Sequence, residues 1–113
     1  MEIKADLYRV WLSDEANCIV FDGILRLNGG EEYAPIAQIL DYAATQGDNM
    51  VIDLQELSFL NSSGIHMLSK FVIQQRKQEN FQIKIIGSSR VPWQEKSLQS
   101  LQRLLPKLII ELR

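Results

Sequence analysis

The stretch VIDLQELSFLNSSGIHML, residues 51–68, decides the fold because it holds a strand, a junction and the start of a helix in immediate succession. Residues 50–54 are all apolar except Asp53. Such continuous apolar runs are typical of strands buried on both faces of a parallel sheet. From residue 62 onward the apolar residues recur at helical spacing. This spacing predicts a helix over 62–79 with an inward face made of Ile65, Leu68, Val72 and Gln75.

Outside this stretch, strands and helices alternate after an N-terminal hairpin. Alternation and branched apolar residues predict strands, and a change to helical period predicts helices. The expected strands are 7–12, 18–27 with a bend at Gly23, 50–54, 81–86 and 107–112; the expected helices are 31–46 ending at Gly47, 62–79, and a third beginning at Pro92; 13–17 is a polar turn. This order predicts a single α/β domain over 1–113, with a mixed sheet whose hairpin is followed by parallel strands and outer helices.

Composition excludes several classes of protein. The chain has 113 residues, 46% of them hydrophobic, and a net charge of -2, which provides a core but no basic field for nucleic acid. One cysteine, Cys18, permits neither an internal disulfide nor a thiolate metal cage, and its apolar neighbours predict an inert core residue. A lone histidine, His66, removes the usual metal and triad constellations. No apolar run spans a bilayer and the N-terminus lacks a signal-peptide core, so we expect a soluble cytoplasmic protein without metal or cofactor.

The junction before residue 62 has two interpretations. Asn61, Ser62 or Ser63 would cap the helix, since each side-chain type accepts a hydrogen bond from a free backbone N–H, and Gly64 permits a close approach. The junction also lies at the carboxyl edge of the sheet, where binding sites gather in open α/β folds. A phosphorylated hydroxyl there would face free N–H groups and the positive end of the helix dipole. The same charge would disrupt a docked apolar protein.

Helical spacing indicates where such a partner would touch. Ser62, His66, Ser69 and Ile73 fall near one line beside the core stripe. His66, Met67 and Lys70 are expected to point further outward, with Met67 as an exposed adaptable contact. The predicted partner-binding surface therefore consists of Asn61, Ser62, Ser63, Gly64, His66, Met67, Ser69, Lys70 and Ile73.

The same stretch closely resembles the signature of STAS domains, the anti-sigma-factor antagonist family. That signature is an apolar strand ending in Asp-Leu, about five residues with an apolar pair, and Asp-Ser-Ser-Gly-Leu at the start of a helix. The order of elements agrees over about residues 6 to 112. The positions that match in type and spacing are Asp53, Leu54, Leu57, Phe59, Ser62, Ser63, Gly64, Ile65 and Leu68.

The resemblance implies a non-catalytic module of a partner-switching system. A serine kinase of the anti-sigma type would phosphorylate Ser62, and a PP2C-type phosphatase would reverse the modification. The unphosphorylated form would bind the kinase and so release a sigma factor or another target. Ser63 is then expected to cap the helix or support the loop. The protein would act in signal transduction and transcription regulation as a cytoplasmic monomer or weak homodimer.

This chain departs from the signature at three positions, and two other functions remain open. Asn61 replaces an aspartate, His66 replaces a small residue, and Arg26 or Asn28 occupies the place of a loop aspartate. A hydrolase using Ser62 with His66 lacks a third orienting group and a G-x-S-x-G sequence, so we expect no enzyme. A scaffold or ligand-binding module that is never phosphorylated is the second alternative, and transfer of phosphate to Ser62 would distinguish it.

Overall fold

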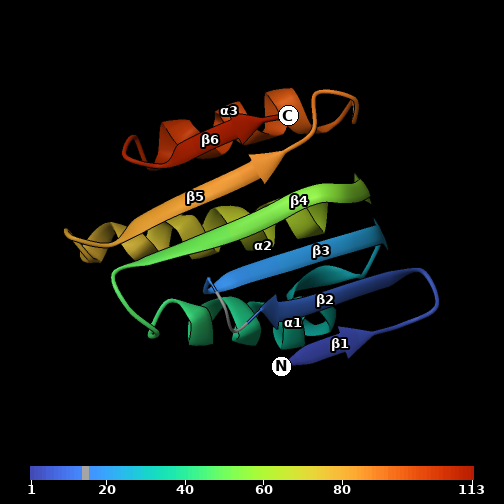
Figure 1. Cartoon of the computed structure of the whole chain (residues 1–113). Coiled ribbons are helices and arrows are strands. Elements are labelled where there is room, and N and C mark those ends of the chain that lie inside the picture. The colour runs from blue at the N-terminus through green and yellow to red at the C-terminus, as the bar shows by residue number, and fades with distance from the viewer. Residues whose placement is uncertain (14–15) are drawn as a thin grey trace.

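The computed structural model describes residues 1–13 and 16–113, in which six strands form one sheet and three α-helices cover one of its faces (Figure 1). The elements are β1 (Glu2–Lys4), β2 (Tyr8–Ser13), β3 (Cys18–Leu25), α1 (Gly29–Ala43), β4 (Asn49–Leu60), α2 (Ser62–Gln74), a 3-10 turn (Gln75–Lys77), β5 (Gln82–Gly87), α3 (Gln94–Leu104) and β6 (Ile109–Leu112). This confirms the predicted α/β class and the predicted order of elements, with one additional strand, β1.

The strands lie in the sheet in the order in which they occur in the chain, β1 to β6. The first three pair antiparallel, which confirms the hairpin, and β3 to β6 pair parallel. Each parallel crossover moves one strand further in the same direction, and because such crossovers share one hand, α1, α2 and α3 all lie on the same face. No helix formed by the described residues lies on the opposite face (Figure 1).

The core lies between the sheet and the helical layer. Fully buried side chains include Ile52, Leu54 and Leu57 from β4, Tyr33, Ile36 and Leu40 from α1, and Leu68 and Val72 from α2. Cys18 is an exception to prediction, because it is half-buried on the helix-free face of β3 and not in the core. Burial and then the Asp53 carboxylate raise the pKa of its thiol, which disfavours the reactive thiolate.

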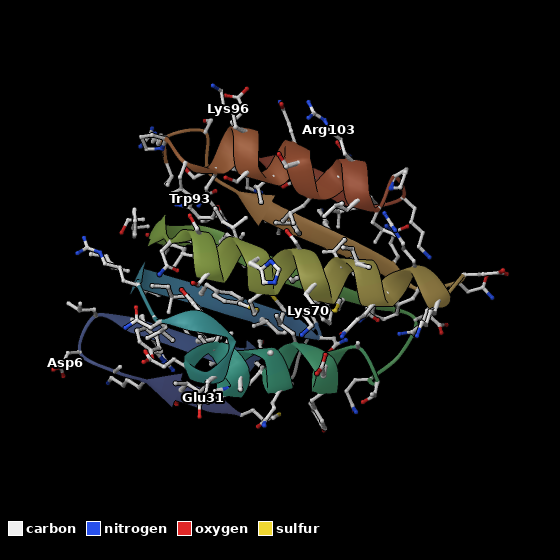
Figure 2. All side chains as sticks on the ribbon, turned by 180° about the vertical axis from the view of Figure 1, so that it is seen from behind. Asp6, Glu31, Lys70, Trp93, Lys96 and Arg103 are labelled. Atoms are coloured by element: carbon white, nitrogen blue, oxygen red, sulfur yellow. The ribbon has the colours of Figure 1, made fainter. Side chains whose placement is uncertain are left out.

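Strand β4 continues to Leu60, well beyond the predicted end at residue 54. Its second half pairs with β3 alone, since the register with β5 stops at Asp53. On the side that β5 leaves free, the start of α3 supplies hydrogen bonds: Trp93 Nε1 donates to the Leu57 carbonyl at 3.0 Å, and buried Gln94 donates Nε2 to the Leu54 carbonyl at 2.7 Å. Figure 2 shows Trp93 between α3 and this end of β4. The side chains of Trp93 and Gln94 thus bind carbonyl groups of β4 that a neighbouring strand would otherwise bind.

The remaining differences concern boundaries. Gly23 lies within the continuous strand β3 with φ of 100°, and the register toward β4 shifts between Gly23 and Ile24. Helix α1 ends at Ala43, so Gly47 belongs to the following turn, and α3 begins at Gln94 and not at Pro92. Helix α2 ends at Gln74 and continues as a 3-10 turn. The predicted turn at 13–17 includes residues 14–15, which lie outside the described residues.

Candidate functional site

The N-terminus of α2 is capped by Asn61. The chain leaves β4 at Leu60, passes through Asn61 in an extended conformation with φ of -77° and ψ of 175°, and enters the helix at Ser62. The Asn61 Oδ1 atom accepts a hydrogen bond from the Gly64 N–H at 3.0 Å. Asn61, one of the three predicted capping candidates, is therefore the cap, and Ser63, which was expected to cap the helix or support the loop, is not. Asn61 is also one of the positions at which this chain departs from the STAS signature.

Asn61 also joins the junction to two other parts of the chain. Its Oδ1 accepts from the Tyr33 hydroxyl of α1 at 2.6 Å, and its Nδ2 donates to the Leu27 carbonyl, in the loop before α1, at 2.8 Å. A carboxylate could accept the first of these bonds but has no proton to donate to Leu27. The amide is therefore the side chain that satisfies all its partners here, which gives a physical reason for asparagine in this chain.

Gly64 lies in a space that admits no side chain. A Cβ atom built there would stand 2.2 Å from Leu60 Cδ1 and 2.7 Å from the Tyr33 hydroxyl oxygen. The predicted close approach is confirmed, with side chains of β4 and α1 as the neighbours. Together with the Asn61 bonds, this contact fixes how α2 starts relative to α1.

Ser62 is exposed at the first residue of α2, and no acidic side chain lies in the first turn of the helix. Among the described residues its hydroxyl has no hydrogen-bond partner. A serine at this place has an accessible oxygen at the positive end of a helix dipole. Ser63 beside it is half-buried.

Solved structures share this architecture, whereas no protein-family model and no curated protein sequence matches the chain. Apo-SiaC from Pseudomonas aeruginosa has a TM-score of 0.74 at 9% identity, with 100% of this chain and 97% of that chain covered. SiaC bound as activator to the diguanylate cyclase SiaD has a TM-score of 0.65 at 12% identity, covering 100% and 99%. An anti-sigma factor antagonist from Mycobacterium paratuberculosis has a TM-score of 0.65 at 17% identity, covering 96% and 90%. The chain has a STAS-like fold.

In this STAS-like chain the exposed side of α2 matches the sequence prediction at most positions. His66, Lys70 and Ile73 are exposed, and Ile73 retains 42% of its accessible surface. Ser69 is half-buried and donates its hydroxyl proton to the Ile65 carbonyl at 2.9 Å, so it is satisfied within its own helix. These residues and Ser62 leave one side of the helix open to a partner.

Met67 is the exception, because it is only 7% exposed. Its spacing from Gly64 and Phe71 places it on the buried stripe of α2, so the expectation of an outward-pointing methionine is wrong. The buried stripe is wider than predicted since α2 is the middle helix and contacts both α1 and α3.

Ser62 and His66, the pair considered for a hydrolase, lie four residues apart on α2. Ser62 and His66 have no hydrogen bond to each other in the described part of the chain. Residues 1–13 and 16–113 contain no group of three or more histidine, cysteine, aspartate or glutamate side chains that could hold a metal ion. No helix in those residues is long and apolar enough to cross a membrane.

Proposed function

We propose that this chain is a non-catalytic protein-interaction module of a partner-switching system. In the unmodified state the exposed side of α2 binds a serine kinase of the anti-sigma type in the cytoplasm. Phosphorylation of Ser62 weakens the complex, and a PP2C-type phosphatase restores it. The observation that carries the proposal is the exposed Ser62 hydroxyl at the first residue of a helix that is already capped by its neighbour.

The geometry supports a modification that the fold tolerates and a partner does not. A phosphate adds a charge of about -1.5 to -2 beside free N–H groups and the positive dipole end, which is favourable within the domain. Asn61, and not Ser62, holds the cap and the bonds to Tyr33 and Leu27, so the modification breaks none of them. The same charge would lie at the edge of any protein surface covering α2 and would lose its water on binding.

The solved structures with this fold agree with a role in protein interaction. SiaC is described as an activator in complex with a diguanylate cyclase, and the mycobacterial protein as an anti-sigma factor antagonist. Both act on other proteins. This supports a protein partner for the present chain, while the partner's kinase identity rests on the Ser-Ser-Gly sequence.

A scaffold that is never phosphorylated is a second candidate. Asn61 favours it, since the aspartate of the signature is missing directly before the acceptor serine. In this case the exposed side of α2 would bind its partner constitutively.

Mass spectrometry distinguishes the two functions. The chain is incubated with ATP and a serine kinase of the anti-sigma type from the same organism, and the proposal expects one phosphate on Ser62. Ser62→Ala should accept none, and Ser63→Ala, the matched control, should accept one. In a binding assay Ser62→Ala should bind with or without ATP, and Ser62→Asp should bind weakly. Equal binding by all forms, or no transfer to Ser62, would overturn the switch.

A further inference from the structure

A groove runs between α1 and α2, with a volume of about 310 Å³, on the side of the molecule that carries the helices. Its floor is apolar and is formed by Ala37, Met67 and Phe71. Met67 is therefore buried from bulk solvent yet lies at the bottom of a depression, where a partner's side chain would reach it. An apolar floor with a polar rim is the usual composition of a binding groove.

The groove is long and narrow. It extends from Gly30 and Ser63, at the starts of the two helices, to Asp41 and Gln74, near their ends. Eleven residues of helix span about 16 Å. A volume of about 310 Å³ distributed over that length makes the groove elongated. It suits the side chains on one face of a helix of about three turns, lying along the two parallel helices.

The two walls carry opposite charges. Among the residues that line the groove, α1 contributes one acidic side chain, Asp41, and α2 contributes Lys70 together with His66 and no acidic side chain. Asp41 and Lys70 stand on opposite rims of the groove, and Figure 2 shows Lys70 on the side of α2 that faces α1. Both side chains are exposed, and no ion pair joins them in the described residues.

We propose that this groove receives one amphipathic helix of a protein partner, with apolar side chains over Met67 and Phe71, a basic flank against Asp41 and an acidic flank against Lys70. The inference rests on the proposed function only in that the occupant belongs to the partner. It extends the contact surface from the outer side of α2, predicted from the sequence, to α1. Ser63 at the end of the groove places the helix beside the modified residue Ser62.

The test uses three synthetic helical peptides of about 18 residues, with a common leucine stripe and different flanks. One peptide has a lysine flank and a glutamate flank, the second has lysine on both, and the third has glutamate on both. Fluorescence anisotropy measures binding to the unphosphorylated chain. The mixed peptide should bind the wild type about threefold to tenfold more tightly than the others, as expected for two exposed charge pairs.

Charge variants of the groove should reverse this preference. Asp41→Lys makes both rims basic, so the glutamate peptide should become the tightest. Lys70→Glu makes both rims acidic, so the lysine peptide should become the tightest. Lys96→Glu on α3, away from the groove, is the matched control and should keep the wild-type order. Ala37→Leu, which fills the floor, should weaken all three peptides if its circular dichroism shows a folded protein.

Binding of no peptide, or an order unchanged by Asp41→Lys and Lys70→Glu, would overturn the groove assignment. The two charge variants alter exposed side chains, so their results stand even if Ala37→Leu fails to fold. The assay contains no kinase and no phosphate. Its failure is therefore distinguishable from absence of transfer to Ser62, which would overturn the proposed function and leave the groove intact.

Discussion

Two asparagines occupy the same place in the fold and behave differently. Asn28 and Asn61 each precede the first residue of a helix that follows a parallel strand. Asn61 makes three side-chain hydrogen bonds, to Gly64, Tyr33 and Leu27. Asn28 is exposed, its side chain makes no capping bond, and its backbone N–H donates to Glu32 Oε1 at 3.0 Å.

Glycines in the first turns of the two helices differ in the same way. Around Gly30 a Cβ atom would meet nothing within 4 Å, whereas at Gly64 it would collide with Leu60 and Tyr33. The Cβ position of Gly30 is thus open, whereas that of Gly64 is packed from two sides, by β4 and by α1. An asparagine before a helix therefore links separate parts of the fold only where residues distant in the chain lie close enough to form hydrogen bonds with its side chain.

Of the substitutions considered at the two helix starts, removal of the Asn61 side chain should lower the free energy of unfolding most. Asn61→Ala loses the cap, worth about 1 kcal/mol, and leaves the Tyr33 hydroxyl and the Leu27 carbonyl without their partner. We expect the free energy of unfolding to fall by about 2–4 kcal/mol in urea titrations. A loss below about 1 kcal/mol would mean that the three bonds contribute little.

Asn61→Asp should have an intermediate effect. The carboxylate still accepts from Gly64 and Tyr33 but faces the Leu27 carbonyl with no proton to donate. We expect a loss of about 1–2 kcal/mol and faster amide hydrogen exchange in the loop before α1. If the Asn61→Asp variant proves as stable as the wild type, the amide donor is not what selects asparagine at this position.

Alkaline titration tests the hydrogen bond between Tyr33 of α1 and Asn61. Burial raises the pKa of Tyr33 above its ordinary value of 10.0. A raised pKa in the folded state contributes stability that is complete below pH 10.0 and is lost as pH rises through the folded pKa. The phenolate also cannot donate to Asn61. The melting temperature should therefore fall above pH 10.0.

Tyr33→Phe is the control for that titration, because other groups also ionise in alkali. The variant should cost about 1 kcal/mol near neutral pH, where the hydrogen bond is lost, and should show a smaller alkaline decrease than the wild type. An equal decrease in both proteins would assign the alkaline transition to other residues.

Asn28→Ala should have the smallest effect and sharpens the comparison. The side chain makes no capping bond, and the bond between its backbone N–H and Glu32 survives the change. We expect a change within about 0.5 kcal/mol in the same urea titrations. A loss as large as that of Asn61→Ala would show that the two helix starts are equivalent in solution.

Local pattern predicted most of the fold and the exposure of Ser62. The hairpin, the parallel crossovers, the start of α2 at Ser62 and the exposure of Ser62 all follow from residues close together in the chain. The extension of β4 did not, because its free carbonyls are satisfied by Trp93 and Gln94 from far along the chain. The amino-acid sequence of residues 55–60 does not indicate that Trp93 and Gln94 will bind this segment.

The capping residue and the depth of Met67 were decided by tertiary packing as well. Asn61, Ser62 and Ser63 are all good capping residues in succession, and local preference cannot choose among them. The hydrogen bonds of Asn61 with Tyr33 and Leu27 favour Asn61 as the capping residue. Met67 lies beside Leu68 and Phe71 on a stripe that is broad because α2 contacts a helix on each side. A sequence pattern shows which residues are apolar, and the neighbours decide how many are covered.

The sequential strand order has a consequence for biosynthesis. Because each new strand joins the edge formed by the one before it, a nascent chain leaving the ribosome can add one strand and helix at a time without waiting for a distant segment. The exception is the exposed end of β4, whose carbonyls stay unpaired until α3 emerges with Trp93 and Gln94. Emergence of residue 94 from the ribosome therefore completes the support of the strand that leads into Ser62.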